Sequence, residues 1–149
     1  MIGHKEGDAD AAATADVAIG CAADSQTTGV AYALVRTGKR QTLMRVPFGC
    51  RPLAALHGRD VTYAATHAVA VRLLDRGLRR VQLMTTDQEL VADLDGRRNV
   101  PAPLTVPYVM LRCLLNRFGA ARVMLADDER RCRDLEARAR AEVSLDIAA

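Results

Sequence analysis

The order of elements around residues 81–96 limits the possible folds of this chain more than any other stretch. Residues 81–84 form an apolar strand pattern, and Asp87 follows them at the start of a helical pattern. An earlier helical pattern covers residues 62–76 and ends at Gly77. The order helix, strand, acid, helix predicts a parallel crossover, with Asp87 at the carboxyl end of a sheet strand. Open α/β sheets place their ligands at that end.

Three further strands are predicted before this unit. Apolar residues indicate strands at residues 16–21, 30–35 and 42–46. Turn residues at 24–29 and 37–39 connect them, and Pro47 stops the third strand. Because short turns make hairpins, we expect these three strands to be antiparallel.

The rest of the chain predicts helix, strand and helix. Prolines 101, 103 and 107 mark a loop before a helix through residues 110–115, and a last strand follows at 122–125. A final helix starts at about Asp128; its predicted buried stripe is Cys132, Leu135, Ala139 and Val143, and its predicted solvated side is Arg130, Arg131, Arg133, Arg138 and Arg140. We therefore expect an α/β fold with a mixed five-stranded sheet and helices on both faces. A chain of 149 residues has room for one such domain, which we place at residues 16–145.

Charge is distributed unevenly along the chain. Residues 1–15 are predicted to be an acidic, flexible leader, in which Lys5 is outnumbered by Glu6, Asp8 and Asp10. The remainder is therefore more basic than the net charge of +3 indicates, and nearly all of its basic residues are arginines, whose guanidinium groups suit phosphate. A basic body with an acidic leader suits a polyanionic partner whose site the leader could shield. A leader that is merely solvated is the alternative.

Composition argues against several classes of protein. Tryptophan is absent and aromatic residues make up 3% of the chain, which gives little support for base stacking on rows of aromatic side chains. The cysteines, Cys21, Cys50, Cys113 and Cys132, form no Cys-x-x-Cys pair, so they predict buried thiols in a reducing compartment and not a zinc ribbon. No apolar run reaches the roughly 18 to 20 residues of a membrane span, and no signal-peptide pattern is present. We expect a cytoplasmic protein with no membrane partner.

The predicted layout resembles the ribonuclease H superfamily over about residues 16–143. Residues 86–91 (Thr-Asp-Gln-Glu-Leu-Val) resemble the family's Asp-Ser-x-x-Val segment, which implies that Asp87 is a metal-binding acid. The alternative role for Asp87 is an N-cap of the following helix. Residues 133–137 resemble the family's Ala-Asp-x-Leu-Ala context and imply Asp134 as a further metal-binding acid, with Asp127 and Asp128 as second choices.

Two acids of the family pattern have no counterpart. The first strand ends in Gly20-Cys21-Ala22, where the family has Asp-Gly-Ser, and Asp24 follows in a predicted turn. The helix that carries a glutamate in the family has Thr62 or Tyr63 at that position. In active members, clustered carboxylates hold two Mg²⁺ ions about 4 Å apart. The resemblance therefore implies a ribonuclease H-like fold with an incomplete acidic site.

Three functions from different classes follow. The first is a catalytically impaired domain that requires no cofactor and binds nucleic acid, either an RNA–DNA hybrid or a duplex; its predicted phosphate contacts are Arg79, Arg80, Arg130, Arg131 and Arg133. The second is an active ribonuclease that uses Mg²⁺ or Mn²⁺ at a rearranged site of Asp24, Asp87 and Asp134. The third is an adaptor on the same fold that binds a protein partner through a sheet edge or the final helix.

Overall fold

A computed structural model describes residues 13–24, 26–97 and 99–148. The strands are β1 (Ala15–Ala23), β2 (Thr28–Thr37), β3 (Arg40–Gly49), β4 (Arg80–Thr85) and β5 (Ala120–Leu125). The helices are α2 (Arg59–Asp75), α3 (Gln88–Leu94), α4 (Thr105–Leu115) and α5 (Glu129–Ala148), with short 3-10 turns at Ala54–Leu56 and Ala102–Leu104. Most of the predicted leader, residues 1–12, lies outside the described residues. The predicted domain end at residue 145 falls inside α5.

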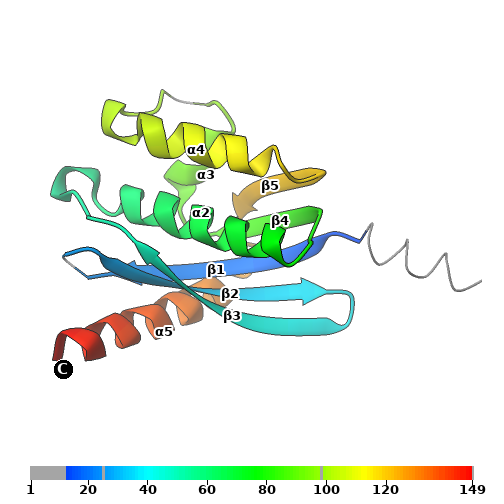
Figure 1. Cartoon of the computed structure of the whole chain (residues 1–149), viewed down its shortest axis with the longest axis horizontal. Helices are drawn as coiled ribbons and strands as arrows, with labels where there is room; N and C mark the ends of the chain where they lie inside the picture. The colour runs from blue at the N-terminus through cyan, green and yellow to red at the C-terminus, as the bar shows by residue number, and fades with distance from the viewer. Residues whose placement is uncertain (1–12, 25, 98, 149) are drawn as a thin grey trace, which may run out of the picture.

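The strands form one sheet in the order β3-β2-β1-β4-β5. β1, β2 and β3 are antiparallel neighbours, whereas β4 runs parallel to β1 and β5 runs parallel to β4. Helices α2, α3 and α4 lie on one side of the sheet and α5 lies on the other (Figure 1). The predicted mixed five-stranded sheet with helices on both faces is confirmed. Asp87 follows β4 at its carboxyl end, next to the central strand β1, as predicted.

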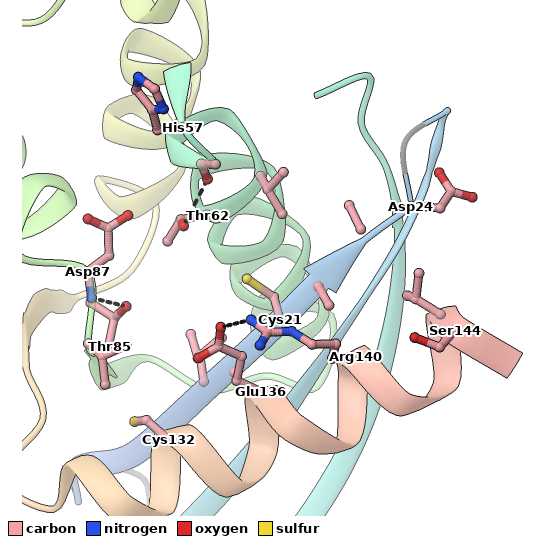
Figure 2. Close-up of a pocket in the computed structure, with 18 residues that line it drawn as sticks. Cys21, Asp24, His57, Thr62, Thr85, Asp87, Cys132, Glu136, Arg140 and Ser144 are labelled. Atoms are coloured by element: carbon pink, nitrogen blue, oxygen red, sulfur yellow. Dashed lines mark hydrogen bonds and ion pairs between the residues drawn. The ribbon is translucent and has the colours of Figure 1, made fainter. Parts of the chain in front are cut away.

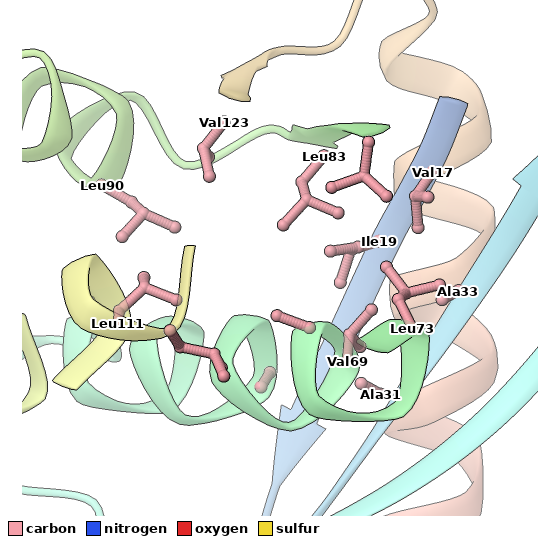
Figure 3. Close-up of a cluster of buried hydrophobic side chains, with 14 of the residues drawn as sticks. Val17, Ile19, Ala31, Ala33, Val69, Leu73, Leu83, Leu90, Leu111 and Val123 are labelled. Atoms are coloured by element: carbon pink, nitrogen blue, oxygen red, sulfur yellow. The ribbon is translucent and has the colours of Figure 1, made fainter. Parts of the chain in front are cut away.

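Alternation along the strands separates the buried side chains into two layers. On one face, Val17 and Ile19 of β1 and Leu83 of β4 pack in a cluster with Val69 and Leu73 of α2 (Figure 3). On the other face, a smaller cluster joins β1 and β2 to α5; its buried members are Ala18, Val30, Tyr32, Cys132, Leu135 and Ala139. The buried stripe predicted for the final helix is therefore confirmed at Cys132, Leu135 and Ala139.

A close contact at Gly20 brings α5 onto β1. A Cβ atom at this position would lie 2.2 Å from the backbone N of Glu136 and 2.7 Å from the carbonyl O of Cys132. Both neighbours belong to the helix backbone and cannot rotate away, so no larger residue fits here unless α5 moves. The absence of a side chain at Gly20 thus sets the distance between α5 and the central strand.

No helix among the residues that the structure describes is both long and apolar enough to cross a membrane.

We expect Gly20→Ala to destabilise the protein by about 2–3 kcal/mol, because overpacking against a rigid backbone costs this much or more. Urea unfolding followed by circular dichroism measures the change. Gly49→Ala is the matched control: it also lies in a strand, but its nearest neighbour is the carbonyl O of Thr27 at 3.8 Å, an ordinary contact. Equal effects of the two substitutions would contradict a fixed separation between α5 and β1.

Candidate functional site

A cavity of about 600 Å³ opens at the carboxyl ends of β1 and β4. Its walls are the end of β1, the start of α2, the segment between β4 and α3, and the inner side of α5 (Figure 2). The polar side chains that line it are Cys21, Asp24, His57, Thr62, Thr85, Thr86, Asp87, Cys132, Glu136, Arg140 and Ser144. This is the end of the sheet at which the sequence predicted a site.

Asp87 lies in the wall of the cavity and caps α3. Its Oδ1 accepts hydrogen bonds from the backbone N–H groups of Glu89 (3.0 Å) and Leu90 (3.1 Å). Its own N–H donates to Oγ1 of Thr85 at 3.1 Å. The predicted N-cap role is confirmed, and the same geometry places the carboxylate at the cavity, as the family resemblance implied.

Glu136 is a further carboxylate of the cavity that was not predicted from the sequence. Its Oε1 accepts a hydrogen bond from Nη2 of Arg140 at 2.7 Å, one helical turn further along α5 (Figure 2). Cys132, Glu136 and Arg140 follow one another at intervals of four residues, and all three line the cavity. Because Cys132 was predicted to be buried, the four-residue spacing could have placed Glu136 on the same side of α5. It also shows that Arg140, assigned to the solvated side, lies at the edge of the cavity.

Asp134 does not lie at the cavity. It is exposed, and it is two residues from both Cys132 and Glu136 on a helix that turns about 100° per residue. Its side chain therefore points away from the sheet, and not toward Asp87 as the metal-binding role implied by the resemblance requires. Being next to the buried Leu135 in sequence does not place a residue on the same side of a helix. The metal-binding role inferred for Asp134 has no geometric support.

Asp24 and the acids after β5 serve local structure. Oδ1 of Asp24 accepts hydrogen bonds from the backbone N–H groups of Thr28, Gln26 and Thr27, at 2.9–3.0 Å. These hydrogen bonds, of which that from Thr28 has the largest effect, lower the pKa of Asp24, which lies half-buried at the rim of the cavity. The predicted turn role of Asp24 is confirmed. Asp127 and Asp128 instead border a smaller cavity beside Asp16 and Arg36.

The two positions where the family pattern has further acids carry uncharged side chains. Burial, and after it the charges of Glu136 and Asp87, raises the pKa of the Cys21 thiol to about 12, so this thiol stays protonated. Thr62 donates its hydroxyl to the carbonyl of Gly58 at 3.3 Å. Tyr63 is buried and points into the core. At the two positions where the sequence resemblance implies carboxylates, the cavity therefore has Cys21 and Thr62.

These residues do not fit a two-metal centre. Asp87 is engaged in capping, Glu136 is paired with Arg140, and Asp24 is held in its turn. Within the described ranges, no group of three or more His, Cys, Asp or Glu side chains is placed to hold a metal ion. A pair of divalent cations needs several free hard oxygen ligands. The donor set thus gives no support to Mg²⁺ or Mn²⁺ as a cofactor at Asp87 and Asp134.

The arginines predicted to contact phosphate fall into two groups. Arg130, Arg131 and Arg133 lie in the first turns of α5, where Arg133 pairs with Glu129 at 3.1 Å and Arg131 borders the smaller cavity. Arg79 and Arg80 lie at the start of β4, at the opposite end of the sheet from the cavity.

Comparisons with known proteins identify the fold. Neither a protein-family model nor a curated protein matches the sequence. Among solved structures, ribonuclease H1 of the halophilic archaeon Halobacterium salinarum NRC-1 is 16% identical, with a TM-score of 0.67 over 87% of this chain and 98% of that one. The N-terminal ribonuclease H domain of rv2228c from Mycobacterium tuberculosis, solved as a fusion with maltose-binding protein, is 13% identical, with a TM-score of 0.65 over 93% and 100%.

A third similar structure, LC11-RNase H1 in complex with an RNA/DNA hybrid, is 12% identical, with a TM-score of 0.59 over 86% of this chain and 97% of that one. The chain therefore has a ribonuclease H-like fold, as the sequence resemblance predicted.

Two substitutions separate the capping role of Asp87 from its charge. We expect Asp87→Ala to lower the free energy of unfolding by about 1 kcal/mol, because two N–H groups of α3 lose their acceptor. Asp87→Asn keeps an acceptor oxygen and should change stability by less than about half of that. Chemical denaturation of both variants tests this, and a large loss in Asp87→Asn would mean that the charge itself stabilises the fold.

The raised pKa of Cys21 predicts that this thiol is unreactive in the folded protein, because the thiolate is the nucleophile. Cys113 is exposed and provides an internal comparison. We expect iodoacetamide at pH 8 to modify Cys113 first, and Cys21 only once urea unfolds the chain; peptide mass spectrometry reads out each site. Equal rates of modification in the folded protein would show that the cavity does not suppress ionisation of Cys21.

Proposed function

We propose that this chain is a catalytically impaired ribonuclease H-like domain that binds nucleic acid, an RNA–DNA hybrid or a duplex, through exposed arginine side chains. The observation that carries the proposal is the content of the cavity: Cys21 and Thr62 lie where the family resemblance implies carboxylates, and Arg140 pairs with Glu136. Removing single essential groups commonly costs orders of magnitude in rate, so a site without two of them should be near background.

Binding is supported by the chemistry of the surface. Arginine forms paired hydrogen bonds with phosphate oxygens, and phosphate contacts supply much of the affinity of nucleic-acid-binding proteins. One structurally similar protein, LC11-RNase H1, has been solved with an RNA/DNA hybrid. The scarcity of aromatic side chains favours contacts with the sugar–phosphate backbone over base stacking.

The proposal predicts binding without turnover. We expect the protein to slow the migration of a labelled RNA–DNA hybrid in a gel-shift assay, and we expect this binding to weaken as the salt concentration rises. The hybrid should remain uncleaved in millimolar Mg²⁺ or Mn²⁺. The ribonuclease H1 of Halobacterium salinarum, assayed in parallel, is the positive control for the substrate.

Two results would contradict this function. Steady cleavage that Asp87→Asn abolishes would establish an active nuclease with a rearranged site. Failure to bind either a hybrid or duplex DNA at low salt would instead favour an adaptor whose partner is a protein.

A further inference from the structure

Five arginines lie in the segments that meet at the amino ends of β4 and β5, the end of the sheet farthest from the cavity. We call them the distal arginine cluster: Arg76, Arg79, Arg80, Arg117 and Arg122. Backbone hydrogen bonds hold their segments together, because the N–H groups of Gly119 (2.8 Å) and Ala120 (3.1 Å) both donate to the carbonyl of Arg79. The parallel register then sets Arg80 beside Ala120 and Arg122 beside Gln82.

All five side chains are exposed, and none forms an ion pair with any residue in the described part of the chain. Among the described residues, the carboxylates at this end are Asp75, in the last turn of α2, and Asp16, which pairs with Gln82 in the sheet. Positive charge is therefore in excess. On α5 the balance differs, since Arg133 and Arg140 pair with glutamates of the same helix.

The sheet leaves part of the cluster uncovered. Arg80 and Arg122 alternate with Val81 and Val123, which are buried in the core on the α2 side, so they project from the opposite face. Helix α5 covers that face only from the level of Met84, whose carbonyl is 3.7 Å from Sγ of Cys132. The amino halves of β4 and β5 lie before this point and are open to a large partner.

From this placement we infer that the distal arginine cluster is the surface that binds the phosphate backbone. The inference rests on the proposed function and gives it a location. Guanidinium groups that have no carboxylate partner can pair with phosphate without breaking an existing ion pair, whereas Arg133 and Arg140 of α5 must first leave their glutamates. Phe118, the aromatic residue inside these segments, is buried and offers no stacking surface. The cluster therefore contacts the backbone and carries little sequence preference.

The test compares two triple variants that remove the same charge. Arg79→Ala/Arg80→Ala/Arg122→Ala changes the cluster, and Arg130→Ala/Arg131→Ala/Arg133→Ala changes the start of α5. The probe is a fluorescent RNA–DNA hybrid of about 20 base pairs, titrated by anisotropy over a salt series. We expect the cluster variant to bind at least tenfold more weakly at low salt and the slope of log K against log salt to fall by about 2–3, since each lost phosphate contact removes about 0.9. The α5 variant should bind within about threefold of the parent.

Further measurements make the result decisive. Urea unfolding of both variants checks that the fold is unchanged, as expected when only exposed side chains are substituted. A third variant keeps the positive charge, Arg79→Lys/Arg80→Lys/Arg122→Lys, and should therefore keep most of the salt dependence of binding. Loss of affinity in the α5 variant alone would overturn the location while leaving nucleic-acid binding in place. If the parent protein does not bind nucleic acid but binds an acidic polypeptide such as polyglutamate, both the location of the phosphate-binding surface and the proposed function are overturned.

Discussion

A buried carboxylate holds helix α3 against the start of α2, which forms one wall of the cavity. The side chain of Asp93 in α3 has no exposed surface; its Oδ2 accepts hydrogen bonds from the Tyr63 hydroxyl at 2.9 Å and from the guanidinium of Arg59, both in α2. Nε of Arg59 also lies 3.0 Å from Glu89. Burial, with the help of Asp93, raises the pKa of Tyr63, so its hydroxyl remains a donor. Because a buried charge that loses its partner costs about 3–5 kcal/mol, this network fixes the start of α2 against α3.

The geometry of the cavity follows from that network and from Gly20. Fixing α2 against α3 sets Thr62 opposite the N-cap Asp87, and the close approach at Gly20 sets Glu136 above the end of β1. Neither constraint depends on a metal ion. A carboxylate at Gly20 itself would collide with the backbone of α5, so the central strand could supply an acid to this cavity only from a neighbouring position such as Cys21.

The sequence predicted the fold more completely than the site, and particular residues show why. Strand alternation and turn residues depend on local sequence, so the five strands and the position of Asp87 after β4 were predictable. The cavity depends on which side of α5 meets the sheet. The family-like context around Asp134 pointed to a residue on the outer side, whereas the four-residue spacing from Cys132 would have identified Glu136. The buried pair of Asp93 and Arg59 joins residues 34 positions apart, and no local pattern indicates it.

The charges of this fold are separated along the strands. Asp24, Asp87 and Glu136 lie at the carboxyl end of β1 and β4, with Arg140 as their nearby counterion, while the distal arginine cluster occupies the other end. A polyanion approaching such a molecule is attracted to the basic end and repelled from the acidic one. In a two-metal nuclease, bound cations would reverse the repulsion at the acidic end and draw the backbone into the site. Here the donor set does not fit such cations, so under the proposed function the same carboxylates would keep phosphate out of the cavity, and binding at the far end would need no contribution from it.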